Sequence, residues 1–109
     1  MKGGICIANA VYCVSYKLKK GASVPDFLLA AEKLNNEQIS KQKGYISWKQ
    51  LVDDKNTWAD LITFETMDDL NSFKEVSKKP TELAKKFYSF MSLNPLSTKI
   101  HLFSVEKNY

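Results

Sequence analysis

The order in which strand-type and helix-type patterns follow one another constrains this fold more than any other feature of the sequence. Residues 7–17, 45–52, 58–65 and 97–106 are rich in the β-branched and aromatic residues that strands favour. One helical pattern separates the first two, and a helical region broken at Pro80 separates the last two. This βαββαβ order is the ferredoxin-like pattern, and it predicts an α+β fold: a four-stranded antiparallel sheet with helices on one face.

Turn and capping residues place the first helix and the hairpin. Ser23 can cap a helix that we expect to run to about Gln42 and to stop at Gly44. The polar residues 53–57 predict a hairpin turn between the second and third strands, with Asn56 at positive φ. The register of this hairpin depends on the turn, and the sequence does not fix it.

The second helical region has its own start and stop signals. Thr66, followed by Asp69, predicts a helix start directly after the hairpin. Pro80 ends that helix, and Thr81 opens a further helical stretch that we expect to end near Pro95. Residues 97–106 then form the last predicted strand.

Length and composition favour one domain and a small set of partners. A chain of 109 residues, 44% apolar and 26% charged, can bury one core and no more, so we expect a single domain over residues 1–109. All sixteen basic residues are lysines. The chain thus has no guanidinium group for bidentate hydrogen bonds to phosphates and bases, so nucleic acid is not an expected partner.

The cysteines and the apolar segments bear on the compartment. Cys6 and Cys13 are seven residues apart, which is about 23 Å along one strand, so they cannot bridge each other there. Two unpaired thiols suit a reducing compartment, and we expect a cytoplasmic protein. No segment approaches the roughly 18 apolar residues of a membrane span, so no membrane partner is expected either.

The predicted strands carry large apolar side chains on both faces. By two-residue alternation, Val11 and Cys13 point opposite to Tyr12, and Ile100 points opposite to Phe103. Two helices can cover only one face of a four-stranded sheet, and the other would be an apolar patch larger than soluble monomers usually expose. We therefore expect a symmetric homodimer whose open faces meet.

Several sequence pieces resemble a known superfamily. They are Tyr16-Lys17-Leu18-Lys19-Lys20-Gly21, Lys43-Gly44-Tyr45-Ile46-Ser47, Trp58-Ala59-Asp60-Leu61 and His101-Leu102-Phe103. With them the chain resembles the dimeric α+β-barrel superfamily, in particular proteins similar to antibiotic-biosynthesis monooxygenases. The resemblance implies a dimer whose sheets form a barrel, and a small apolar cavity between each sheet and its helices.

The resemblance implies some activities and argues against others. Haem-degrading members of the superfamily use an Asn in the first strand, a Trp near the end of the third and a His in the helix that follows. Here Val14 and Phe64 stand at the first two places, and the second helical region has no histidine. Haem degradation is therefore not expected. Cofactor-free monooxygenases oxidise polycyclic phenols, but their cavity residues cannot be matched here position by position.

Two side chains are candidates for catalysis, His101 and Asp60. His101 is the only side chain whose ordinary pKa lies near neutrality, although a lone histidine on a strand is often structural. Asp60 is the one charged member of an apolar row with Trp58, Ile62 and Phe64. Depending on register it pairs with Lys49 or Gln50 of the second strand, or it faces a cavity where burial would raise its pKa and let it act as a base.

Aromatic residues supply the candidate ligand-binding site. The set is Tyr12, Tyr16, Trp58, Phe64 and Phe87. These residues line a pocket for an apolar, aromatic small molecule, or they form the core. The expected function is accordingly a cofactor-independent monooxygenase or isomerase, and the alternative is a non-catalytic ligand-binding or structural homodimer. No sequence motif supports a metal, nucleotide or flavin cofactor.

Overall fold

The structure, a computed structural model, describes residues 9–92 and 98–109 and has the predicted α+β architecture. In chain order its elements are β1 (Ala10–Leu18), α1 (Val24–Glu37), the 3-10 helix η1 (Ile39–Lys41), β2 (Tyr45–Val52), β3 (Thr57–Phe64), α2 (Met67–Ser77), α3 (Glu82–Tyr88), β4 (Met91–Ser92) and β5 (Lys99–Ser104). None of the helices in the described part of the chain is long and apolar enough to cross a membrane.

The sheet is antiparallel, and it contains five strands instead of the predicted four. Its order is β2-β3-β1-β4, and β5 pairs with β1 as well. Both late strands lie along one edge of β1, with β4 against Lys17 and Leu18 and β5 against the preceding residues of β1. The two interior strands are therefore β3 and β1, as the ferredoxin-like order requires.

The additional strand corrects the predicted end of the last helix. Helix α3 ends at Tyr88, and Met91, which falls within the predicted helical stretch, begins β4 instead. The Lys19 backbone N–H donates to the Phe90 carbonyl over 2.8 Å and holds this segment beside β1. Two residues are too few to show a strand period in the sequence. Asn94 and Pro95 lie outside the described residues.

The helix starts and the hairpin turn confirm the capping predictions. Ser23 Oγ accepts from the Asp26 N–H at 3.3 Å. Thr66 and Thr81 accept in the same way at the starts of α2 and α3. Asn56 has φ 61° in the β2–β3 turn, as expected. The three caps satisfy backbone N–H groups in the first turns of α1, α2 and α3.

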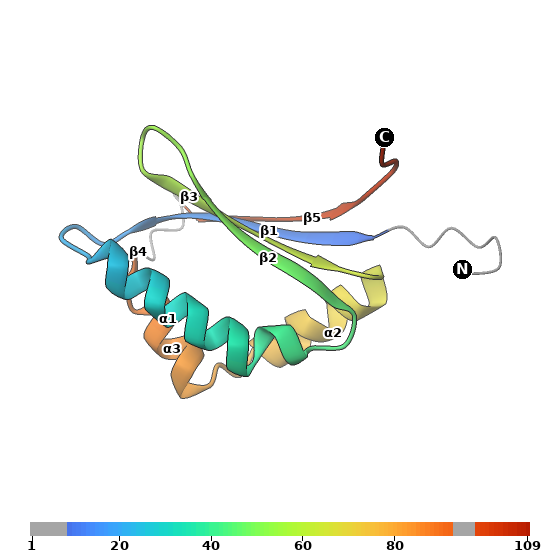
Figure 1. Ribbon diagram of the computed structural model, residues 1–109, viewed down its shortest axis with the longest axis horizontal. Helices are drawn as coiled ribbons and strands as arrows, with labels where there is room; N and C mark the ends of the chain where they lie inside the picture. The colour runs from blue at the N-terminus through green and yellow to red at the C-terminus, as the bar shows by residue number, and fades with distance from the viewer. Residues whose placement is uncertain (1–8, 93–97) are drawn as a thin grey trace.

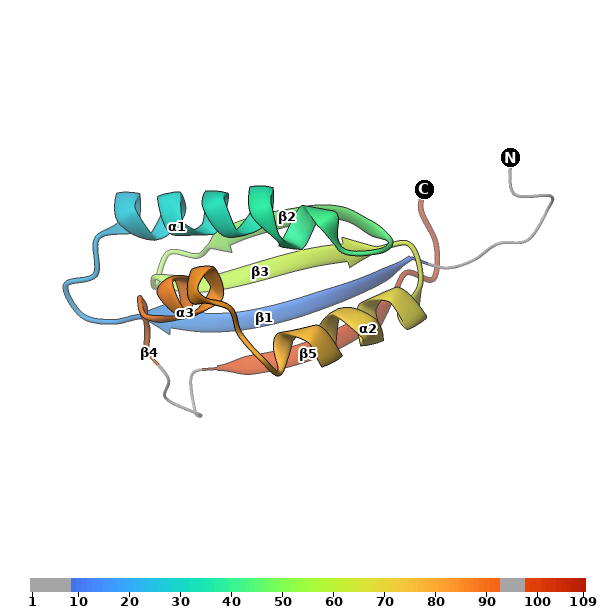
Figure 2. The same cartoon turned by 90° about the horizontal axis from the view of Figure 1, so that it is seen from below.

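All helices lie on one side of the sheet (Figure 1), with α1 along the β2 side (Figure 2). The strand residues on this side form what we call the covered face, and in β3 they are Trp58, Asp60, Ile62 and Phe64. All four are buried, and they alternate with half-buried neighbours, so the predicted row on one face is confirmed. The opposite side is the open face.

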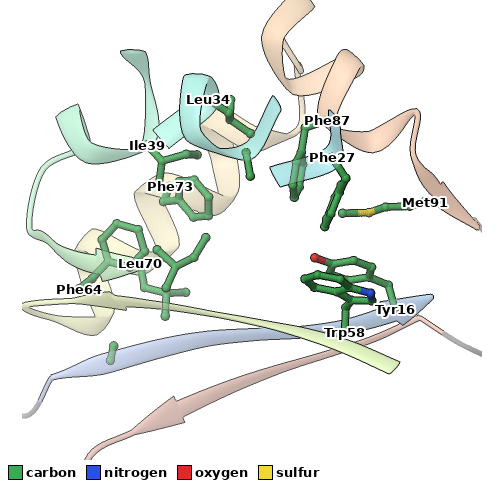
Figure 3. Close-up of a cluster of buried hydrophobic side chains, with 13 residues drawn as sticks. Tyr16, Phe27, Leu34, Ile39, Trp58, Phe64, Leu70, Phe73, Phe87 and Met91 are labelled. Carbon is green, nitrogen blue, oxygen red and sulfur yellow. The ribbon is translucent and has the colours of Figure 1, made fainter. Parts of the chain in front are cut away.

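The core under the covered face is largely aromatic (Figure 3). Phe27 of α1 is fully buried and stacks on Phe87 of α3, with ring centroids 5.1 Å apart. The Phe27 ring also meets the Trp58 ring edge-on, with centroids 5.2 Å apart. A second group pairs Phe64 with Phe73 at 5.2 Å. Buried aromatic pairs of this kind add about 0.5–1.5 kcal/mol each beyond their area burial.

The open face is partly apolar and has no helix over it. The strand residues that share this face with Leu61 are Val11, Cys13, Ser15, Lys49, Leu51, Ala59, Thr63, His101 and Phe103. Leu51 and Phe103 are 48% and 51% exposed. Cys13 is half-buried and forms no disulfide within the described segments, and Cys6 lies outside them. The apolar side chains on both faces match the sequence pattern.

Candidate functional site

A cavity of about 250 Å³ lies between the covered face and the helices. Strands β1, β2, β3 and β5 form its floor, and residues of α1, α2 and α3 form its walls. Tyr88 and Ile100, both on the lining, are 39% and 56% exposed, so the cavity opens to solvent between α3 and β5. Ligand pockets usually measure about 300–1,000 Å³, and this cavity lies just below that range, so it has room for a small molecule only.

Asp60 is the charged group of this cavity. It sits in the middle of β3, between Val14 of β1 and Gln50 of β2 in the sheet register. The register therefore settles the hairpin partner that the sequence left open, in favour of Gln50. The Asp60 side chain lines the cavity, yet the residue is only 2% exposed.

Tyr16 holds the Asp60 carboxyl in place. The Tyr16 hydroxyl donates to Asp60 Oδ1 over 2.8 Å, and both residues are buried. Tyr16 lies two positions beyond Val14 on β1, so it reaches Asp60 diagonally across the sheet. Burial and the adjacent carboxyl raise the pKa of Tyr16, which keeps its hydroxyl protonated as a donor.

Burial raises the pKa of the Asp60 carboxyl from 3.8 to about 7. The groups that partly offset this shift are neutral donors on Tyr16, Trp48 and Gln50. A carboxyl with a pKa near 7 is present in both protonation states at neutral pH. It can therefore accept a proton and release it again under the same conditions.

Two further donors lie beside Asp60 without a hydrogen bond of ordinary geometry. Trp48 Nε1 and Gln50 Nε2 are close enough to lower the pKa of the Asp60 carboxyl. Both nitrogen atoms are buried, and neither has a partner among the described residues within ordinary distance and angle limits. The indole and amide N–H groups thus favour the charged form of the carboxyl, as the Tyr16 hydroxyl does.

Most of the cavity lining is aromatic or aliphatic. Tyr12, Trp48, Phe73, Phe87 and Tyr88 contribute rings. Tyr12 meets Phe73 edge-on at 5.7 Å, and Trp48 meets Phe87 edge-on at 5.4 Å, so these rings are fixed by packing. Burial, Tyr88 and Asp60 raise the pKa of Tyr12. Such a lining suits a flat apolar ligand.

The structure distributes the candidate ligand-binding residues over two places. Tyr12 and Phe87 line the cavity, and Tyr16 lies behind Asp60. Trp58 and Phe64, at the two ends of the covered row, pack into the core under Phe27 and Phe73 (Figure 3). Trp48 is not in that candidate set, and the position of its N–H beside Asp60 has no signal in the sequence.

The two candidate catalytic residues lie on opposite faces of the sheet. Asp60 is on the covered face, whereas His101 of β5 is level with Cys13 on the open face. His101 is exposed and stacks on Phe103, with ring centroids 5.9 Å apart. The two residues therefore do not act on one ligand within this cavity.

The described residues contain no group of three or more His, Cys, Asp or Glu side chains arranged to hold a metal ion. The donors gathered around Asp60 are an indole, an amide and a phenol. These groups can bind and orient an organic molecule that contains oxygen.

The sequence matches no protein-family model and no curated protein, whereas solved structures match over nearly the whole chain. SnoaB, a cofactor-independent oxygenase from Streptomyces nogalater, has a TM-score of 0.68 at 10% identity, covering 93% of this chain and 96% of its own. A hydroxynitrile lyase from Passiflora edulis has 0.64 at 17%, covering 93% and 96%. A heme-degrading protein from Mycobacterium tuberculosis has 0.61 at 10%, covering 95% and 98%.

The chain has the antibiotic-biosynthesis-monooxygenase-like fold. The ferredoxin-like α+β fold of the subunit, as predicted from the sequence, is therefore confirmed. The three structures are those of an oxygenase, a hydroxynitrile lyase and a heme-degrading protein. The fold alone therefore does not determine the reaction. The reaction has to be argued from the residues of the cavity.

Proposed function

We propose that this protein binds an apolar, aromatic small molecule in the Asp60 cavity and that Asp60 removes a proton from it, in a cofactor-independent oxygenation or isomerisation. The observation that carries the proposal is a buried carboxyl, with a pKa raised to about 7, on the wall of an apolar cavity. Proton transfer by a positioned side chain is most effective when its pKa lies near the working pH.

The chemistry needs no group beyond the chain, the ligand and, for oxygenation, dioxygen. The Asp60 carboxylate takes a proton from an acidic O–H or C–H of the ligand, and the bond pair stays on the ligand as an anion. Isomerisation follows when Asp60 returns that proton to a different carbon. Oxygenation follows when the ligand carbanion forms a C–O bond with dioxygen and the resulting peroxide takes up the proton held by Asp60. Loss of the remaining hydrogen at that carbon then breaks the O–O bond and gives a carbonyl group and water.

In this proposal the protein is a homodimer whose two subunits meet through their open faces. Its apolar side chains, with Leu51 and Phe103 about half exposed, support this arrangement. Sedimentation equilibrium of the unmodified chain should give twice the 12.4 kDa monomer mass. Leu61→Lys, which places a second cation beside Lys49 in the register, should give a folded monomer. A 12.4 kDa particle at millimolar concentration would rule out this dimer.

Proton exchange tests the catalytic part without knowledge of the natural substrate. 1-Indanone is a small aromatic ketone with exchangeable C–H bonds beside its carbonyl group. In deuterated buffer at pH 7 the protein should speed deuterium uptake at that carbon, and Asp60→Asn should slow the catalysed rate by about 100-fold or more. Asp54→Asn changes an exposed turn carboxyl in the same way and should leave the rate unchanged.

The same experiment separates catalysis from binding alone. If 1-indanone binds in the cavity without any protein-dependent exchange, the protein is a ligand-binding dimer and not an enzyme of this kind. If exchange persists in Asp60→Asn, another group moves the proton and the assignment of Asp60 is wrong. Binding is located by amide chemical-shift changes at cavity residues such as Tyr12 and Phe87.

A further inference from the structure

A groove lies at the end of the sheet where β1 leads into α1 and where the β2–β3 hairpin turns. The β1–α1 loop and this hairpin lie at the end of the molecule opposite the C-terminus (Figure 1). The groove has a volume of about 550 Å³, within the range of about 300–1,000 Å³ that is usual for ligand sites. It shares no lining residue with the Asp60 cavity, so it is a second and separate candidate site.

Most of the groove lining is apolar. Leu18 ends β1, Ala22 lies in the loop that follows, and Val24 begins α1. Val52 ends β2 on the hairpin side, and Trp58, only 8% exposed, lines the groove from β3. Val24 and Val52 are 41% and 51% exposed. Exposed apolar side chains that meet around one hollow favour the binding of an apolar group.

Hydrogen bonds hold both sides of the groove in place. In the β1–α1 loop the Ala22 N–H donates to the Lys19 carbonyl over 3.0 Å. In the hairpin Asp53 Oδ1 accepts from the N–H groups of Lys55 and Thr57 at 2.8 and 2.9 Å. Because both turns are fixed by their own hydrogen bonds, the groove exists before any ligand binds.

The charged side chains on the lining are both cations, Lys17 and Lys19. Lys17 Nζ donates to the Lys55 carbonyl over 3.0 Å, which places it against the hairpin and uses one of its three N–H groups. Among the described residues no carboxylate lines the groove. Asp53 directs Oδ1 into its own turn, and Asp26 lines a different hollow between α1 and α3. The groove is therefore apolar and positively charged at the same time.

We propose that this groove binds an amphipathic organic anion, a carboxylate with an unbranched apolar chain such as a medium-chain fatty acid. The chain lies against Val24, Val52 and Trp58, and the carboxylate lies beside the ammonium groups of Lys17 and Lys19. A neutral ligand would leave both ammonium groups unused, and a cationic ligand would be repelled by them. Lysine attracts an anion as a point charge, so this site needs no arginine.

Three octyl probes of similar length test the proposal on the unmodified protein. Octanoate, 1-octanol and octylammonium differ in the charge of the head group. Octanoate should shift the amide NMR signals of Leu18, Ala22 and Val52 and bind about fivefold more tightly than 1-octanol, and octylammonium should not bind. Raising the salt concentration from about 0.02 M to about 0.5 M should abolish the preference for octanoate, because salt screens exposed charges.

A pair of lysine substitutions separates the groove from the charge of the whole protein. Lys19→Gln removes one groove cation and should weaken octanoate binding by about threefold, while 1-octanol binding stays unchanged. Lys41→Gln makes the same change at an exposed lysine of η1, outside this lining, and should change neither affinity. NMR titration gives the dissociation constants of all three proteins.

Three results would overturn the proposal. Octanoate that does not bind, or that binds no better than 1-octanol, would show that the groove is not an anion site. Shifts at Tyr12 and Phe87 in place of the groove residues would place the ligand in the Asp60 cavity. An equal loss in Lys41→Gln would show attraction to the net charge of +4 alone. None of these results bears on the proposed function, which is tested separately with 1-indanone and Asp60→Asn.

Discussion

The covered and open faces of the sheet are made from the same strands but have different physical environments. On β3, Asp60 and Ile62 are 2% and 4% exposed, whereas their neighbour Leu61 on the open face is only half-buried. Helices pack on the first face and leave the second without a partner (Figure 1). The alternation of one strand thus separates the face that lines the cavity from the face that no helix covers.

The same contrast explains why the two candidate proton carriers differ. Asp60 is desolvated on a cavity wall and held by the Tyr16 hydroxyl. His101 is an exposed residue that contacts another open-face ring, Phe103. A side chain that titrates near pH 7 in water is not thereby placed for catalysis, while burial can bring an ordinary carboxyl into that range.

The largest expected effect tests the burial of Asp60 through stability. Its pKa rises from 3.8 to about 7 on folding, so the native state binds the extra proton between these values. This contribution to stability is complete below pH 4 and is lost as the pH rises through 7, by about 4 kcal/mol in total. Asn does not titrate. The free energy of unfolding of Asp60→Asn, measured with urea relative to that of the unmodified chain, should therefore increase by about this amount between pH 4 and pH 8. A constant difference would contradict the burial account.

A pair of neighbouring alanine substitutions compares the packing of the two faces. Ile62→Ala removes a buried side chain from the covered face and should lower the free energy of unfolding by about 2–5 kcal/mol. Leu61→Ala, on the open face, should cost about 1 kcal/mol in the monomeric state. Urea unfolding at low protein concentration gives both values. Equal costs would show that the open face is as tightly packed as the covered one.

The two glycines with positive φ extend the comparison to packed and open turns. Gly44 and Gly21 have φ of 77° and 79°. A Cβ at Gly44 would overlap the Asp69 side chain, whereas a Cβ at Gly21 would meet nothing within 4 Å. Gly21→Ala should therefore cost about 1 kcal/mol from backbone strain alone, and Gly44→Ala about twice that or more. Similar melting temperatures for the two variants would contradict this difference in contact.

The smallest expected effect concerns His101. Because its side chain lies on the open face, His101→Gln should change the rate of α-hydrogen exchange in 1-indanone by less than about twofold, against about 100-fold or more for Asp60→Asn. The two rates are measured by NMR in deuterated buffer at pH 7. If His101→Gln lowered the exchange rate as much as Asp60→Asn does, the catalytic group would lie on the open face.

Local signals in the sequence were sufficient for most of the fold. Ser23, Thr66 and Thr81 cap the helices, and Asn56 takes positive φ, because these preferences depend on a few neighbouring residues. Strand β4 was missed because two residues show no period, and its pairing with β1 is a long-range contact. Local patterns cannot encode such a contact.

The candidate site was predictable only in part, for a related reason. Alternation along β3 identified Asp60 as the odd member of an apolar row. Its partners Tyr16, Trp48 and Gln50 come from other strands, and their approach depends on a hairpin register that the turn residues left open. The same alternation could not show that Trp58 joins the core, because that depends on where Phe27 packs.

One measurement tests the central claim most directly, the titration of the Asp60 side-chain carboxyl by ¹³C NMR. Burial on the cavity wall predicts a midpoint at about pH 7. Tyr16→Phe, which removes the hydroxyl donor, should move that midpoint further upward. A midpoint near the ordinary value of about 3.9, unchanged in Tyr16→Phe, would show a solvated carboxylate and contradict a role for Asp60 as the base.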